Sequence, residues 1–179
     1  MDSILVVCYS FTGNSRRLAG LLASHHGWPL GEIRDAAPRS NLGCLLDSLL
    51  RRKPAIRYDG PDPADFRTVV LVSPIWAWRL AGPMRSFIAA HQDALRRVAV
   101  LSTRGGSGAS NALLEIDRLL GHPPLLADAF TAQEILDGSC TARAIAFGDA
   151  LVPGSTRVRA GEPGAWAPHG STTAHQGTP

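Results

Sequence analysis

Short apolar runs alternate along the chain with segments in which apolar residues recur every three or four positions. The runs at residues 4–8, 69–72 and 98–102 are continuous, which is typical of parallel strands buried on both faces. Residues 28–35 predict a weaker strand at a sheet edge, and residues 125–131 predict the last strand. The pattern therefore predicts five strands.

The segments between these runs have the periodicity of amphipathic helices. The first helix is expected to begin near Asn14 or Ser15, the third at Pro83, and the last after Ser139 as its N-cap. Residues 58–66, rich in turn formers, are expected to lead into the second buried strand. Because each parallel connection needs a crossover, the alternation predicts an α/β domain with helices on both faces of a parallel sheet. The apolar faces of the helices fall within residues 18–25, 42–50, 84–95, 113–120 and 144–151.

The composition changes near the end of the chain. Residues 1–152 predict one domain, whereas residues 153–179 are rich in Gly, Pro, Ser and Thr without any period. We expect a poorly ordered tail, with docking of Trp166 onto the domain as the alternative. The first strand follows Met1 too closely for a signal peptide, and no apolar run reaches membrane-spanning length. These features favour a cytoplasmic protein.

The charge argues against nucleic-acid binding. The net charge is +3, and the 18 basic residues are arginines apart from Lys53. The arginines are dispersed, and neither a basic face with aromatics nor a known reading motif is present.

Neither the cysteines nor the histidines predict a metal site. The three cysteines, Cys8, Cys44 and Cys140, lack metal-ligand spacing, and their odd number favours reduced thiols in a cytoplasm. Cys8 is expected to be a buried, inert thiol. The histidines on helical patterns are assigned structural or surface roles; they are His25, His26 and His91.

Three loops with unusual composition follow the three buried strands, at residues 9–15, 73–83 and 102–111. Ligands of open α/β sheets bind beyond the carboxyl ends of the strands, so these loops predict one site.

The first loop predicts a phosphate site. The helix that follows it directs free backbone N–H groups and a partial positive charge toward the loop. Gly13 permits close backbone approach, and Ser10, Thr12 and Ser15 offer hydroxyl groups. The Walker loop and the GxGxxG fingerprint are both absent. A simple helix cap is the alternative, but one cap accounts for one hydroxyl group and not for three.

These motifs resemble those of the flavodoxin-like proteins. Ser10-x-Thr12-Gly13-x-Ser15 resembles their [ST]-x-T-G-x-[ST] phosphate loop, residues 62–88 look like their third strand and isoalloxazine loop, and residues 101–108 resemble the loop after their fourth strand. The resemblance covers residues 3–151. It implies a flavodoxin-like three-layer sandwich with a five-stranded parallel sheet of order 2-1-3-4-5, which binds FMN at the junction of strands one and three, as in flavodoxin itself.

The resemblance also implies which residues bind FMN, and it implies no catalytic side chain, because the flavin carries the chemistry. The phosphate would be held by Ser10, Phe11, Thr12, Gly13, Asn14 and Ser15. The flavin ring would be wrapped by Pro74, Ile75, Trp76, Ala77 and Trp78. Its pyrimidine edge would meet Thr103, Arg104, Gly105 and Gly106. Ordinary burial is the alternative for the tryptophans, and a simple turn is the alternative for the glycines.

Two departures from the electron-carrier flavodoxins favour an enzyme. Those carriers are strongly acidic, whereas this chain is basic, and residues 102–108 provide no aromatic residue to cover the second face of the flavin. Arg104 is a candidate for stabilising the negative charge of the reduced flavin, and Arg79 for holding an anionic substrate or a nicotinamide phosphate. Both arginines have a solvated surface role as the alternative.

The leading hypothesis is an FMN-dependent oxidoreductase that passes reducing equivalents from NAD(P)H to a quinone or a similar small-molecule acceptor. The second is a flavodoxin-type electron-transfer module for a redox protein partner. The third is a flavin-free interaction scaffold, against which the intact phosphate loop counts. Dimers and tetramers are common among the related reductases, so an oligomer is compatible with this resemblance.

Overall fold

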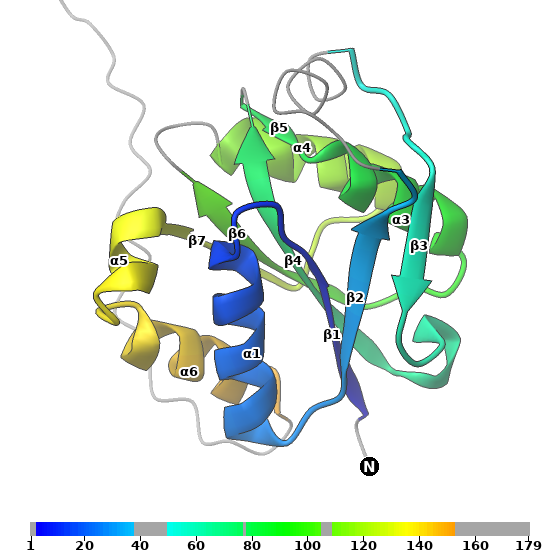
Figure 1. Cartoon of the computed structure of the whole chain (residues 1–179). Helices are drawn as coiled ribbons and strands as arrows, with labels where there is room; N and C mark the ends of the chain where they lie inside the picture. The colour runs from blue at the N-terminus through cyan, green and yellow to red at the C-terminus, as the bar shows by residue number, and fades with distance from the viewer. Residues whose placement is uncertain (1–2, 38–49, 77, 105–108, 153–179) are drawn as a thin grey trace, which may run out of the picture.

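Among the residues that the structure describes, seven strands form a central sheet. The computed structural model describes residues 3–37, 50–76, 78–104 and 109–152 (Figure 1). The strands are β1 (Ile4–Tyr9), β2 (Leu30–Asp35), β3 (Ile56–Asp59), β4 (Thr68–Trp76), β5 (Arg79–Leu80), β6 (Val98–Arg104) and β7 (Leu126–Thr131). The helices are α1 (Asn14–His26), α3 (Gly82–His91), α4 (Ala109–Leu120), α5 (Ala132–Leu136) and α6 (Thr141–Asp149), with a 3-10 turn η1 (Pro63–Asp65).

The sheet is mostly parallel and has the order β3-β2-β1-β4-β6-β7, with β5 paired to β4. The five strands from β2 to β7 along this order pair in parallel. Strands β3 and β5 add antiparallel pairs to β2 and β4. The α/β fold with a mostly parallel sheet is therefore confirmed, whereas the expectation of a purely five-stranded parallel sheet is wrong.

Helices cover both faces of the sheet, as Figure 1 shows, with α1, α5 and α6 on one face and α3 and α4 on the other. The alternation of side chains along a strand divides β1 between two cores. Ile4, Val6 and Cys8 pack with α1 and α6, whereas Leu5, Val7 and Tyr9 pack with α3 and α4. The chain thus forms a three-layer structure.

Several predicted elements differ in detail. Strand β2 is not at the edge of the sheet, because β3 pairs with it in antiparallel orientation and forms the edge. The sequence did not predict β3, since its segment runs into the turn formers Asp59 and Gly60. The helix that opens near Pro83 ends at His91, before Leu95. Ser139 does not cap the last helix; Cys140 occupies the N-cap position of α6 without a side-chain bond.

Some predictions lie outside the described residues, namely the helix at residues 42–50, apart from its last residue, and the tail at residues 153–179. Within the described residues, no helix is both long enough and apolar enough to cross a membrane.

Candidate functional site

The three strands that precede the predicted loops lie next to one another in the sheet. Strand β4 pairs in parallel with β1 on one side and with β6 on the other. Their carboxyl ends therefore reach the same edge of the sheet, where the chain turns from β1 into α1 (Figure 1). This edge brings the described parts of all three loops together.

The N-terminus of α1, called the cradle below, directs its first backbone N–H groups toward this edge of the sheet, an arrangement that suits an anion. Gly13 is the N-cap residue and has a φ of 95°, a left-handed conformation that favours glycine. No side chain caps the helix, so its first N–H groups are not satisfied by a capping hydroxyl. The Oγ of Ser10 accepts a hydrogen bond from the Gly13 N–H at 3.1 Å, which closes the turn before the helix.

The three hydroxyl groups of the first loop have different surroundings. Thr12 is exposed at the loop surface. Ser15 is 1% exposed, and its Oγ lies 2.8 Å from Oγ1 of Thr103 at the end of β6. This buried hydrogen bond links the first loop to the third. Of the three side chains, Thr12 is the exposed one at the mouth of the cradle.

The tryptophan segment is a tight β hairpin. Ile75 and Trp76 at the end of β4 pair with Leu80 and Arg79 of β5. Trp78, between the two strands, has a φ of 60° and is 57% exposed. A bulky side chain rarely takes this left-handed conformation, and such strain concentrates at functional sites.

Aromatic contacts join this hairpin to the first loop. The ring of Trp76 meets Phe11 with centroids 5.6 Å apart and Tyr9 with centroids 5.9 Å apart, both edge to face. The hydroxyl of Tyr9 donates a hydrogen bond of 3.0 Å to Asp35 at the end of β2. Sequence reasoning missed Tyr9 and Asp35. The signal available for Tyr9 was a polar aromatic residue at the last position of an apolar run.

The other predicted binding residues that the structure describes have side chains that are more buried than expected. Pro74 and Ile75 are buried within β4, so their side chains belong to the sheet. Thr103 and Arg104 were expected in a loop but form the end of β6, where Thr103 is buried and Arg104 half-buried. Ala77, Gly105 and Gly106 lie outside the described residues.

Several solved structures have a fold similar to that of this chain. A flavoprotein from Lactobacillus acidophilus, solved in complex with FMN, superposes with a TM-score of 0.64; it is 18% identical, over 77% of this chain and 98% of that chain. The chain has a flavodoxin-like fold. The Trp repressor binding protein from Bacillus subtilis has a TM-score of 0.54 and 12% identity, over 80% of this chain and 97% of that chain. A flavone reductase superposes with a TM-score of 0.51. It is 14% identical, over 82% of this chain and 60% of that chain.

The likeness is one of structure, since no protein-family model matches the chain and no curated protein does.

A buried ion pair supports the tryptophan hairpin of this flavodoxin-like sheet. Nε of Arg85 donates to Oε1 of Glu115 at 2.7 Å, and the N–H of Leu80 in β5 donates to Oε2 at 3.2 Å. Arg85 also donates to the backbone carbonyls of Leu80 and Arg52. Sequence reasoning missed this pair, although Glu115 interrupts the apolar stripe of α4 next to Ile116.

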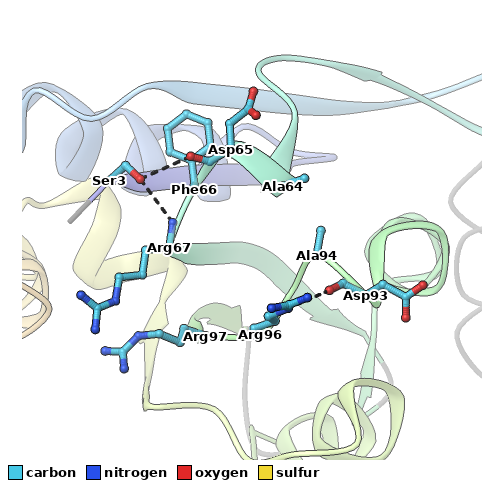
Figure 2. A pocket seen from close by; sticks show the side chains of 9 residues that line it. All are labelled: Ser3, Ala64, Asp65, Phe66, Arg67, Asp93, Ala94, Arg96 and Arg97. Atoms are coloured by element: carbon cyan, nitrogen blue, oxygen red, sulfur yellow. Dashed lines mark hydrogen bonds between the residues drawn. The ribbon is translucent and has the colours of Figure 1, made fainter. Parts of the chain in front are cut away.

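A hollow lies at the opposite, amino end of the strands (Figure 2). It has a volume of about 710 Å³, and three arginines, Arg67, Arg96 and Arg97, line it together with Asp65 and Asp93. Arg67 and Arg97 directly precede β4 and β6. Because none of the predicted binding residues lines this hollow, it is separate from the candidate site.

Proposed function

We propose that the chain binds FMN at the carboxyl edge of β1, β4 and β6. The observation that carries this proposal is the meeting of an uncapped helix N-terminus with a strained, exposed tryptophan hairpin at one edge of a flavodoxin-like sheet. In this proposal the phosphate binds the first-turn N–H groups of α1, Gly13 and Thr12. Ser15 acts through Thr103, since the two hydroxyl groups already bond each other.

The residues present fit a ligand with one phosphate and a flat ring. Backbone N–H groups at a helix N-terminus suit a phosphate and need no lysine. The exposed ring of Trp78 offers an apolar surface to a planar group, and Trp76 in the same hairpin packs edge to face against Tyr9 and Phe11. The remaining predicted contacts of the ring and its pyrimidine edge are Pro74, Ile75, Ala77, Thr103, Arg104, Gly105 and Gly106.

We propose further that the protein is an oxidoreductase that uses NAD(P)H and reduces a quinone or a similar acceptor. When bound, FMN would supply the redox chemistry between the nicotinamide donor and the acceptor. The chain binds and orients the ring, and Arg104 at the end of β6 adds positive charge near its pyrimidine edge. The net charge of +3 is opposite in sign to that of the acidic carrier flavodoxins, which supports the enzyme over the carrier.

The first experiment is a visible absorption spectrum of the purified full-length protein, followed by titration of the stripped protein with FMN. We expect a flavin spectrum and one FMN bound per chain. In Thr12→Ala/Ser15→Ala the affinity for FMN should fall, whereas Ser139→Ala, an exposed residue before α6, serves as the matched control. A colourless protein that binds no added FMN would overturn the proposal and leave the scaffold hypothesis.

A second measurement separates the enzyme from the electron-transfer module. The FMN-loaded protein is mixed with NADPH or NADH and a soluble quinone, and loss of nicotinamide absorbance is followed. Steady turnover supports the oxidoreductase. An FMN-loaded protein that oxidises neither nucleotide, yet passes electrons when a separate reductase is added, identifies the electron-transfer module instead.

A further inference from the structure

Two histidines and an aspartate meet at the ends of two neighbouring helices. His25 and His26 are the last residues of α1, and Asp149 is the last residue of α6. Figure 1 shows α6 beside the lower half of α1 on the same face of the sheet. One ligand atom from each of the three side chains lies within 4.8 Å of the other two.

The His26 ring is held in place by its surroundings. Its side chain is 8% exposed, and the ring stacks on Trp28 with centroids 4.3 Å apart and planes 16° from parallel. Nδ1 faces Oδ1 of Asp149 at 3.9 Å. Nε2 lies against Gly148, where any side chain would collide with it, and it is buried without a hydrogen bond to the described residues. A fixed ring therefore presents one nitrogen to the carboxylate.

The electrostatics of this corner favour a bound cation. The carboxyl ends of α1 and α6 meet here, and each contributes the negative end of a helix dipole. An imidazole nitrogen is a ligand that zinc-class metals accept, and Nδ1 of His26 already faces the carboxylate. Asp149 supplies the negative charge.

We propose that His25, His26 and Asp149 form a binding site for a divalent transition metal of the zinc class, which ties the end of α1 to the end of α6. Two imidazoles and a carboxylate are a donor set that zinc accepts, with water as the fourth ligand. Ligand atoms around a tetrahedral zinc lie roughly 3.4 Å apart, given bond lengths of about 2.1 Å. The observed 3.9 Å between Nδ1 and Oδ1 needs only a small approach, and the exposed His25 side chain can turn to complete the site.

The proposal does not depend on FMN, because the cluster lies at the end of α1 remote from the phosphate cradle. Sequence reasoning predicted no metal site because the ligands lie on two helices that are distant in sequence. The adjacent pair His25-His26 was the available signal.

Calorimetric titration of the full-length protein with Zn²⁺ tests the site, with and without FMN. We expect one Zn²⁺ per chain at this site, a higher Tm on binding, and at least a roughly tenfold loss of affinity in each of His25→Ala and Asp149→Asn. Both changes are at exposed positions and leave the core intact. The matched control is His169→Ala/His175→Ala, which removes the two histidines of residues 153–179. Its affinity for Zn²⁺ should equal that of the parent protein.

A spectroscopic readout locates the metal. Since His26 stacks on Trp28, paramagnetic Cu²⁺ bound here should broaden the indole NMR signal that Trp28→Phe identifies. Zinc affinity that survives in His25→Ala/Asp149→Asn, or broadening that spares Trp28, would overturn the proposal and assign the binding to adventitious histidines.

Discussion

Trp78 holds a left-handed backbone conformation while exposing more than half of its surface. For residues with a Cβ this conformation costs roughly 1–2 kcal/mol, a cost that glycine escapes. We expect Trp78→Gly to be more stable than Trp78→Ala by about 1 kcal/mol in urea denaturation, since only glycine releases the strain. Both variants lose the ring and should bind FMN more weakly than the parent protein. Equal stability of the two variants would show that the backbone relaxes at no cost.

Ser15 and Thr12 differ in burial, so their removal should have different consequences. Ser15→Ala leaves the buried Thr103 hydroxyl without its partner, and we expect the free energy of unfolding to fall by about 1–2 kcal/mol. Thr12 is exposed, so Thr12→Ala should leave stability within about 0.5 kcal/mol of the parent while weakening FMN binding. Urea denaturation of the FMN-free protein and FMN titration measure the two effects separately. Equal losses of stability would contradict this division of roles.

At the scale of elements, the Arg85–Glu115 pair fastens β5 to α3 and α4. The two side chains are 2% and 9% exposed. Glu115→Gln leaves the buried guanidinium without its countercharge, and we expect a loss of about 3–5 kcal/mol. The double variant Arg85→Met/Glu115→Met should recover part of this loss, because neither charge is then buried alone. Urea denaturation of Arg85→Met, Glu115→Met and the double variant measures the coupling energy between the two side chains.

The matched control for this cycle is the exposed pair of Arg16 and Glu32, whose nitrogen and oxygen lie 2.9 Å apart. Arg16→Ala should cost at most about 1 kcal/mol, because water screens this pair. A coupling energy for Arg85 and Glu115 as small as that would show that the hairpin is held by other contacts.

Elements with long apolar runs were predictable from the sequence, and short ones were not. Strand β1 and helix α1 begin where the pattern places them, because continuous burial and a three-to-four period leave little choice. Helix α5 has only five residues, too few for a period, and the capping box of Thr131 and Glu134 was its one local signal. Strand β3 lies at a sheet edge and has only four residues; their burial alternates between half-buried and exposed, but so short an alternation is hard to distinguish from the turn residues that follow it.

At the scale of the molecule, the sequence indicated which loops meet but not how they are held together. Parallel strands with continuous apolar runs place their carboxyl ends at one edge, which made the meeting of the three loops predictable. The bonds between Ser15 and Thr103 and between Tyr9 and Asp35 join segments far apart in sequence. Such pairings depend on strand register, which a continuous apolar run such as that of β1, buried on both faces, does not specify.

The molecule as a whole should lose stability in alkali through the buried thiol of Cys8 and the half-buried phenol of Tyr58. Burial, and then the negative charge of Glu32, raise the pKa of Cys8 from 9.0 to about 12. Burial, and then the charges of Asp62 and Asp59, raise the pKa of Tyr58 from 10.0 to about 12. In the unfolded chain both groups ionise near their ordinary pKa, so rising pH favours the unfolded state. Their contribution is complete below about pH 9 and is lost as pH rises toward 12.

This sequence is well suited to the measurement, because Lys53 is its one lysine and arginine stays protonated throughout the range. Between about pH 8 and about pH 10.5 we expect urea denaturation to show a loss of about 2 kcal/mol from Cys8, with a smaller loss from Tyr58. Cys8→Ala removes the larger contribution, so its stability should fall less steeply over the same range even though it starts lower. Thr12→Ala, which changes no titrating group, should follow the slope of the parent protein. A Cys8→Ala slope identical to that of the parent would mean that Cys8 ionises in the folded protein at its ordinary pKa.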